Sequence, residues 1–321
     1  MSSKVDICNL HGETGMIEMS AAAPFAEGSK PVVYPRATQV VSRVDLDHAN
    51  VARVYDYMLG GSIHWTIDRA FARLVDAQVP QFRGIVLAHR QFAKRAVRHL
   101  TTLGVRQFVD IGSGLLSKEN THQLADEAVP DSRVIYVDND PVAAAHVEIL
   151  LDEFGDPNRH AIIDSDLREP EELWDDVLAT GLIDLGEPIA ILMFSVLHHF
   201  EPDPDGKDDG ARIVARYREL LPAGSYLGIS HVTGEGVPPA LELKLRGLKH
   251  LWDEWCSGKV FARSSAAIKA LFGDFELIDP GVVWTPRWRP DDDGASYADS
   301  PSEAAVLAGV GRKPPVSRAC R

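Results

Sequence analysis

"RQFVDIGSGLLSKEN", residues 106–120, is the stretch from which the fold of this chain can be predicted. It begins as a short apolar run suited to a buried strand, carries one acid, Asp110, and then breaks at Gly112 and Gly114 into residues that can begin a helix. Glycines at a strand end let a ligand approach the backbone and leave amide N–H groups free. A tight turn beside a surface acid has the same pattern, so the motif alone is weak evidence for a site.

Short apolar runs of the same kind follow, separated by stretches with helical spacing: "SRVIYVDND", "RHAIIDSD", "PIAILMFSVLHH" and "GSYLGISHVT". Strands that alternate with helices predict a parallel sheet buried on both faces, because parallel strands need long crossover connections. Two more candidate strands lie in 274–284 and 303–313, after candidate helices in 241–255 and 264–272. The expected fold class is α/β, doubly wound and mostly parallel.

The chain ahead of the first strand has a different texture. Apolar spacing predicts helices in 50–61, 66–79 and 82–104, whereas the preceding residues show no sustained period. A segment without such a period buries too little apolar surface to fold, so we expect a mobile tail there. The expected division is an N-terminal tail over 1–45, a helical region over 46–104, an α/β domain over 105–313 and a C-terminal tail over 314–321.

Composition argues against several classes of protein. The longest apolar run, 189–197, is much shorter than the roughly 20 residues that a membrane helix needs, and the N-terminus has no basic segment followed by an apolar one. Three distant cysteines favour neither a disulfide framework nor a zinc site, and the acidic loop 201–210 lacks the full calcium-loop pattern. The net charge of -14 opposes nucleic-acid binding. We expect a cytoplasmic protein without a metal, nucleic-acid or membrane partner.

Acids also end the next two predicted strands. Asp138 can accept hydrogen bonds from both hydroxyls of a ribose. Asp166 and Leu167 can accept from an exocyclic amine and cover an aromatic base, although Asp166 could equally cap the helix expected near Pro170. Dinucleotide-binding turns usually have a third glycine, whereas this chain has Ser117 there and an acid before the first glycine. The set favours a cationic ligand over an anionic one.

Seven motifs in the chain occur in the order of a known family: "ARVYDYMLGG", "RQFVDIGSGL", "VIYVDNDP", "DLREP", "VLHHF", "GSYLGISHVT" and "GVGRK". From about Val44 to Lys313 the chain resembles the actinobacterial S-adenosyl-L-methionine-dependent methyltransferase family first classed as a domain of unknown function. The resemblance implies the class I methyltransferase fold, which is a Rossmann-like sheet of seven strands with the last strand antiparallel, here preceded by a helical cap.

The resemblance also implies roles for individual residues. Ser195 and His198 would border the reacting methyl group. Along the cofactor, from its methionine portion to its adenine, the implied contacts are Asp110, Gly112, Gly114, Asp138 at the ribose, Asn139 beside the adenine and Asp166 at the adenine amine. A sulfonium is a fixed cation, so carboxylates around it stabilise it, while the same charge would repel the diphosphate of a nicotinamide cofactor.

Two parts of the chain depart from the family pattern. Members usually continue the double glycine with a Lys-Asp-Asn-Phe type stretch, whereas Ser62 to Trp65 read "SIHW" here, and His89 replaces an expected asparagine. Tyr57 and Trp65 are candidates to contact the cofactor or the acceptor from the cap, although aromatic residues at helical spacing commonly belong to a core. If the cap closes over the cofactor, these departures could alter substrate choice or activity.

Histidines at or just after strand ends are the candidates for a general base. His198 is preferred and His231 follows it. Methyl transfer is an in-line displacement that can proceed by alignment and desolvation alone, so a base is not obligatory.

The leading hypothesis is an S-adenosyl-L-methionine-dependent methyltransferase that acts on a small-molecule acceptor. A second hypothesis is a non-catalytic module that binds S-adenosylmethionine or S-adenosylhomocysteine, and a third is a NAD-dependent oxidoreductase. The sequence leaves the acceptor, the methylated atom and the oligomeric state open.

Overall fold

The structure is a computed structural model, and it describes residues 5–8, 14–17, 44–116, 119–200, 202, 205, 208–291 and 296–315. It consists of two units, Met1–Ser42 and Arg43–Arg321. In the first unit, β1 (Val5–Cys8) pairs antiparallel with β2 (Thr14–Ile17), which the sequence pattern did not indicate. The described residues do not include the rest of the predicted N-terminal tail before Val44. They also leave out Ser117 of the glycine turn and residues 316–321 of the predicted C-terminal tail.

The second unit is built on an eight-stranded sheet with the order β5-β4-β3-β6-β7-β10-β8, in which β9 also pairs with β10. The strands are β3 (Gln107–Ile111), β4 (Arg133–Asp138), β5 (His160–Asp164), β6 (Ile189–Phe194), β7 (Tyr226–Val232), β8 (Glu276–Leu277), β9 (Val283–Trp284) and β10 (Val306–Arg312). β3 to β7 are parallel to their neighbours, and β10 runs antiparallel to β7. The predicted α/β class with a mostly parallel sheet is confirmed.

The sheet has one strand more than the resemblance implied, because the candidate strand in 274–284 is divided. Pro280 has no N–H for a ladder, and Gly281 has a φ of 83°, so the chain turns between β8 and β9. Both short strands pair with β10.

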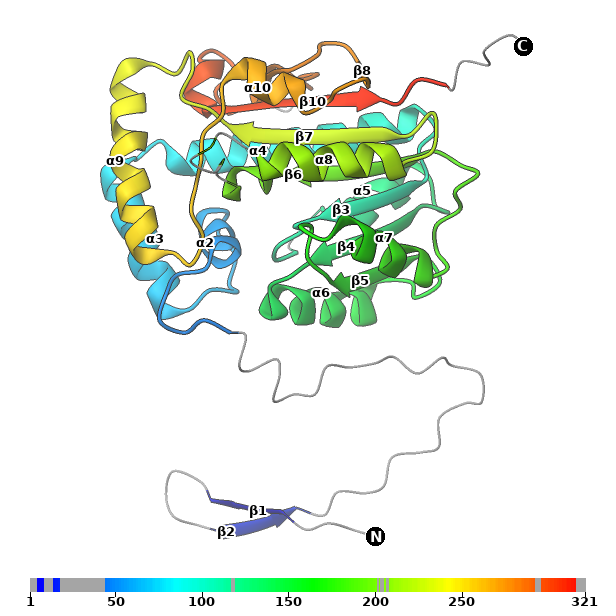
Figure 1. Ribbon diagram of the computed structural model, residues 1–321. Helices are drawn as coiled ribbons and strands as arrows, with labels where there is room; N and C mark the ends of the chain where they lie inside the picture. Colours follow the sequence, from blue (N-terminus) through cyan, green and yellow to red (C-terminus); the bar gives the residue numbers. More distant parts are fainter. Residues whose placement is uncertain are drawn as a thin grey trace, which may run out of the picture. The chain divides into compact units, whose positions relative to one another are not determined.

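Helices cover both faces of the sheet (Figure 1). One apolar cluster contains side chains of α4 (Phe82–Thr102), α5 (Thr121–Ala128) and α6 (Pro141–Phe154). The cluster on the opposite face contains side chains of α7 (Pro170–Ala179) and α8 (Asp209–Leu220) and of the residues that follow α10 (Ser265–Ala270). Phe108 packs in the first cluster and Val109 in the second, as alternation along a strand buried on both faces requires.

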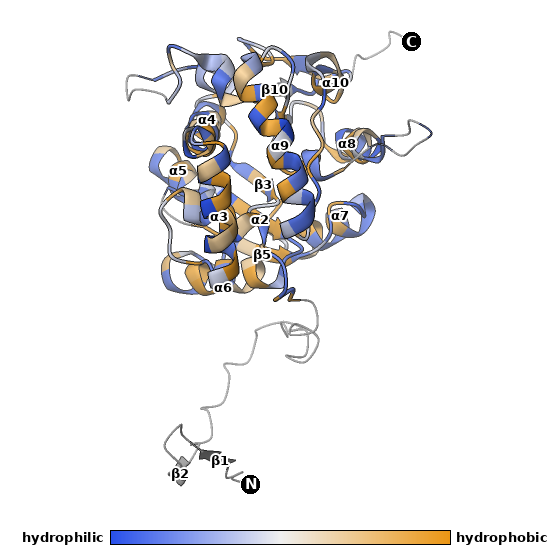
Figure 2. Ribbon diagram, turned by 90° about the vertical axis from the view of Figure 1, so that its left-hand side faces the viewer, coloured by the Kyte–Doolittle hydropathy of each residue, from blue (hydrophilic) through white to orange (hydrophobic). Residues whose placement is uncertain are grey.

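The strand order reverses at β3, which lies between β4 and β6, so a crevice is expected at the carboxyl ends of these strands. Beyond these ends stand α2 (Val51–Met58), α3 (Thr66–Gln78) and α9 (Pro239–Trp255) (Figure 1), and the view from that side shows α3 and α9 in front of β3 (Figure 2). They share a third apolar cluster, in which the rings of Phe71 and Trp252 meet edge to face with centroids 5.2 Å apart.

A buried ion pair fixes α2 against α3. The side chain of Asp68 is fully buried, and it accepts hydrogen bonds from Arg53 Nε at 2.7 Å and from the backbone N–H groups of Asn50 at 2.9 Å and Trp65 at 2.7 Å. The Arg53 guanidinium also lies 3.8 Å from the centroid of the Trp65 ring. Asp68 therefore joins the start of α2 to the start of α3.

Contacts with α2 hold Ser62 to Trp65, the segment that the sequence resemblance marked as different from the family. Asp56 accepts a hydrogen bond from the N–H of Ile63 at 2.8 Å, and the His64 ring packs edge to face on Tyr57 with centroids 5.0 Å apart. The segment thus packs between α2 and α3.

Among the residues that the structure describes, no helix combines the length and the apolar character that a membrane crossing requires.

Removing one partner of a buried ion pair leaves the other partner charged and without compensation. We predict that Asp68→Ala lowers the free energy of unfolding by about 3–5 kcal/mol. Asp76→Ala is the matched control, because Asp76 lies on the same helix and pairs with Arg83 at 3.1 Å in a partly exposed position. It should lower stability by at most about 1 kcal/mol. Urea denaturation of both variants measures the difference, and equal losses would contradict a special role for Asp68.

Candidate functional site

A cavity of about 1000 Å³ lies at the carboxyl ends of β3, β4 and β6, in contact with α2, α4 and α9. Polar residues from the strand ends form one wall, and apolar residues from the three helices form much of the rest. The sequence-predicted residues that line it are Asp110, Gly112, Gly114, Asp138, Asn139, Asp166, Leu167, Ser195 and His198. The structure therefore brings together residues from four strand ends.

The glycine turn after β3 needs glycine at both positions. Gly112 and Gly114 have φ values of 70° and 60°, a region that side-chain-bearing residues rarely adopt. A Cβ on Gly112 would lie 2.1 Å from Cγ1 of Val196, so the loop after β6 can approach only a glycine. The N–H of Gly112 donates to the carbonyl of Val137 at 2.8 Å, which holds the turn against β4.

Asp138 at the end of β4 is bound to this turn. Its Oδ2 accepts a hydrogen bond from the N–H of Gly114 at 2.8 Å, and its Oδ1 accepts one from the N–H of Asp140 at 2.9 Å. Burial raises the pKa of Asp138 to about 6, although these two hydrogen bonds oppose the shift. Each carboxylate oxygen has a second lone pair, so Asp138 can hold the turn and still accept a bond from a ligand hydroxyl.

Asp110 is half-buried, and its Oδ2 accepts a hydrogen bond from the Thr121 hydroxyl at 2.6 Å. Burial raises the pKa of Asp110, whereas the bond from Thr121 and the charge of Arg90 lower it. Arg90 lies on α4 and lines the same cavity. This part of the wall thus offers both a carboxylate and a guanidinium, which suits a ligand that carries both charges.

Asp166 and Asn139 line the cavity together, because Asn139 Nδ2 donates to Asp166 Oδ2 at 3.1 Å. Arg168 Nε lies 3.0 and 2.9 Å from the two oxygens of Asp166. Burial raises the pKa of Asp166, but the hydrogen bonds from Arg168 and Asn139 outweigh it and leave the pKa below its usual value. An adenine amine at Asp166 would share this carboxylate with Arg168.

The two predicted histidines have different surroundings. His231 does not line the cavity: its Nδ1–H donates to the carbonyl of Val232 at 2.8 Å, and its Nε2 accepts from Arg263 at 2.6 Å. Both of its nitrogens are occupied, so this geometry does not support His231 as a base. His198 lies on the short helix η1 (Leu197–His199) and lines the cavity. Its pKa lies well below the usual value, because it is buried and His199 and His231 lie beside it.

Tyr57 and Trp65, the predicted cap residues, do not line the cavity, whereas Tyr55 does. Residues two apart on a helix point about 200° away from each other, so only one of Tyr55 and Tyr57 can face inward from α2. Tyr57 packs beside His64 and Arg83 instead.

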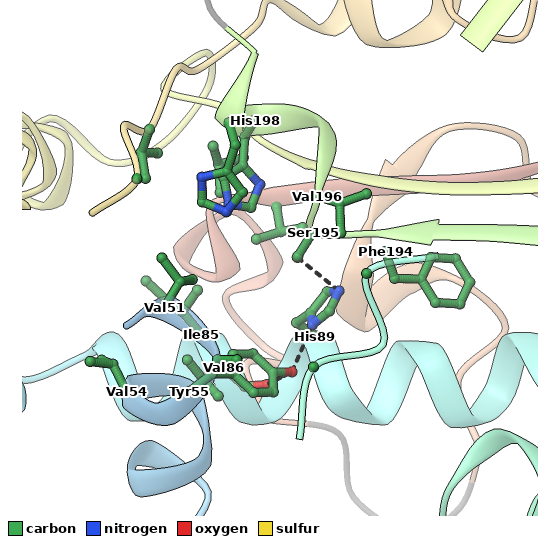
Figure 3. A pocket seen from close by; sticks show the side chains of 18 of the residues that line it. Val51, Val54, Tyr55, Ile85, Val86, His89, Phe194, Ser195, Val196 and His198 are labelled. Carbon is green, nitrogen blue, oxygen red and sulfur yellow. Dashed lines mark hydrogen bonds between the residues drawn. The ribbon is translucent and has the colours of Figure 1, made fainter. Parts of the chain in front are cut away.

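Sequence reasoning missed Tyr55 and His89, two polar residues of the cavity wall that connect to the predicted Ser195. Tyr55 Oη lies 2.8 Å from His89 Nδ1, and His89 Nε2 lies 2.9 Å from Ser195 Oγ (Figure 3). His89 Nε2 also lies 2.8 Å from Ser230 Oγ. The positions of Tyr55, His89 and Ser195 in the chain are too distant for any local pattern to relate them. The one available signal was the expectation, drawn from the sequence resemblance, that His89 replaces an asparagine.

The cavity fits S-adenosyl-L-methionine on chemical grounds, because its wall includes glycine backbone, the half-buried carboxylates of Asp110, Asp138 and Asp166, and the guanidinium of Arg90. Carboxylates stabilise a sulfonium cation, and the left-handed glycines leave room at the strand ends. The residues present therefore match the group that the sequence resemblance implied.

Comparison with known proteins agrees with this geometry. A family model described as S-adenosyl methyltransferase matches residues 37–314. A solved structure from Thermobifida fusca with a methyltransferase assignment is 34% identical, covers 88% of this chain and 100% of that one, and superposes with a TM-score of 0.74. A DUF574 family protein from Streptomyces avermitilis is 31% identical, with 84% and 99% of the chains covered and a TM-score of 0.75.

A search among functionally curated proteins gives no significant match. The family match spans most of the chain. The chain therefore belongs to the S-adenosyl methyltransferase family and is a methyltransferase that uses S-adenosyl-L-methionine.

Proposed function

We propose that this methyltransferase transfers the methyl group to a small molecule held between η1 and the helices α2, α4 and α9. The observation that carries the proposal is the continuity of the cavity, which extends from the carboxylates at the strand ends to apolar residues such as Val54, Ile85 and Leu248. A site walled by helices suits a small acceptor better than a surface segment of a macromolecule. The net charge of -14 also opposes a nucleic-acid acceptor.

Particular residues would hold the cofactor. Gly112 and Gly114 would contact its methionine portion, and Asp138 would accept hydrogen bonds from the ribose. Arg90 is the residue that we propose for the methionine carboxylate, because a guanidinium binds carboxylates with two parallel hydrogen bonds and Arg90 lines the cavity beside Asp110. Asn139 and Leu167 line the cavity where the adenine would lie.

The bound cofactor supplies a methyl group on a positively charged sulfur. A lone pair of the acceptor forms the new bond to the methyl carbon while the carbon–sulfur bond breaks, and its electron pair stays on sulfur as a neutral thioether. A proton carried by the acceptor atom passes to a base or to water. The protein contributes alignment and exclusion of water, which can supply much of the rate enhancement. The comparisons favour neither an oxidoreductase nor a non-catalytic binding module.

His198 is the residue that we propose as the base where the acceptor loses a proton. It lines the cavity, and its buried Nδ1 has no partner among the described residues. Burial lowers its pKa, so the ring is neutral near neutral pH and Nδ1 is positioned to accept a hydrogen bond from the acceptor, while the lowered pKa makes the ring a weak base. We predict that His198→Asn lowers kcat about 10²-fold or more with a hydroxyl acceptor and leaves affinity for S-adenosylhomocysteine unchanged. Single-turnover kinetics measures this, and an unchanged rate would exclude the role.

Asp138→Ala should weaken binding of S-adenosylhomocysteine about tenfold to hundredfold, because a hydrogen bond to a charged group contributes about 1.5–3 kcal/mol. Isothermal titration calorimetry measures the affinity. Asp164→Ala is the matched control: Asp164 pairs with Asp138 in the register of β4 and β5, is exposed and does not line the cavity. Asp138→Asn checks that any loss reflects the charge and not a collapsed turn. Equal affinities for wild type and both Asp138 variants would contradict the ribose assignment.

The pKa of Asp138 also predicts a pH dependence. Its raised pKa of about 6 means that the carboxyl becomes protonated as the pH falls through 6, and a neutral carboxyl accepts ribose hydrogen bonds less well. We therefore expect affinity for S-adenosylhomocysteine to be nearly constant above pH 7 and to fall toward tenfold per pH unit below about 6. Asp138→Asn should lose this dependence. Parallel pH profiles for the two proteins would show that another group is responsible.

A further inference from the structure

The distances around His89 favour one direction for its hydrogen bonds. The Tyr55 hydroxyl lies 2.8 Å from His89 Nδ1 and 3.5 Å from the carbonyl of Val86, so the better acceptor for its hydrogen is Nδ1. His89 Nε2 then carries the ring hydrogen and donates to a serine Oγ, at 2.8 Å for Ser230 and 2.9 Å for Ser195. The Ser195 hydroxyl can therefore turn its own hydrogen toward the cavity.

His89 stays neutral in these surroundings. Burial and the charge of Arg90 lower the pKa of His89 to about 3, and burial raises the pKa of Tyr55 to about 12. Neither group changes its charge near neutral pH. Tyr55, His89 and Ser195 thus form a series of donors and acceptors in which both ring nitrogens of His89 have partners, so we assign His89 no role as a base.

Ser195 is held in an uncommon backbone conformation. Its φ is 57°, in the left-handed region that disfavours residues with a Cβ. Its N–H donates to Ser230 Oγ at 2.9 Å, and Ser195 follows β6 directly at the point where the sheet opens into the cavity. Strained residues of this kind cluster at functional sites, where the surroundings fix them in place.

Besides Tyr55, His89 and His198, this part of the cavity is lined by apolar side chains (Figure 3). Val51 and Val54 come from α2, and Ile85 and Val86 come from α4. A charged group placed among them would lose its hydration without gaining a partner of opposite charge. A neutral ligand with one polar atom toward Ser195 fits this wall.

We propose that Ser195, oriented by His89 and Tyr55, donates a hydrogen bond to an accepting atom of a neutral, largely apolar methyl acceptor. Ser195 touches the acceptor, and His89 and Tyr55 are positioning residues that act through it. The inference rests on the proposed function and deepens it by naming the chemical class of the acceptor.

The test compares ligands of nearly equal shape. Naphthalene has no polar atom, quinoline replaces one CH by a hydrogen-bond-accepting nitrogen, and 2-naphthoate adds a negative charge. Equilibrium dialysis gives the affinity of the full-length protein for each, with and without saturating S-adenosylhomocysteine. We expect quinoline to bind about tenfold more tightly than naphthalene, as one buried hydrogen bond allows, and 2-naphthoate to bind most weakly.

The variants separate positioning from general damage. Ser195→Ala should reduce the quinoline-to-naphthalene affinity ratio to about 1 while naphthalene affinity stays the same. Ser195→Gly removes the same hydroxyl but suits the left-handed backbone, so it should give the same ratio in a protein at least as stable. Tyr55→Phe and His89→Leu should lower the ratio to an intermediate value. If every variant lost both its affinity for naphthalene and its preference for quinoline, Tyr55, His89 and Ser195 would only maintain the shape of the wall. That result would overturn the proposal.

Other results also decide the question. An unchanged ratio in Ser195→Ala, equal affinities of wild type for quinoline and naphthalene, tightest binding of 2-naphthoate, or no binding of any of the three would overturn the proposal. Failure of S-adenosylhomocysteine to bind would contradict the proposed function instead. The ratio measured without that ligand would still decide the role of Ser195.

Discussion

The buried carboxylate of Asp68 is the constraint on which the placement of the cap depends. It binds Arg53 and the N–H of Asn50, and the side chain of Asn50 in turn donates to Asp140 Oδ2 at 2.6 Å. Asp140 caps α6 and donates its own N–H to Asp138, which also holds the glycine turn. A single sequence of polar contacts therefore connects the packing of α2 on α3 with the wall of the cofactor cavity. Because these groups are shielded from water, misplacing one of them leaves its partners unsatisfied.

The electrostatics of the cavity follow from how its acids are buried. Asp110 and Asp138 have raised pKa values, because the protein supplies them with only a few hydrogen bonds in exchange for water. A cation placed beside them would restore the lost stabilisation of charge. Asp166 already has Arg168 as a partner and a lowered pKa. The positive charge of a sulfonium is thus best accommodated near Asp110 and Asp138, while the region of Asp166 is better suited to a neutral base.

The strand ends could be predicted from the sequence because a strand and its terminal acid form a local pattern. The parallel sheet, the glycine turn and the convergence of Asp110, Asp138 and Asp166 follow from that pattern and from the rule that parallel carboxyl ends share one edge. The sequence could not predict which residue of a helix points into the cavity, since Tyr55 lines it in place of Tyr57. For α9, the sequence predicted a helix but could not show that it packs on α3, more than 150 residues earlier, since only the folded chain brings them together.

The roles of the histidines could not be predicted from the sequence either, because they depend on partners that are distant in the chain. His231 is occupied by Arg263, while His89 reaches Ser195, which lies 106 residues away. The two departures that the sequence resemblance implied consequently differ in their structural surroundings. Ser62 to Trp65 pack between α2 and α3, where Trp65 covers Arg53, so they act on the stability of the cap. His89 lies in the cavity wall, and its Nε2 is 2.9 Å from Ser195 Oγ. A difference in acceptor choice between this chain and its relatives should therefore depend on position 89 more than on positions 62–65.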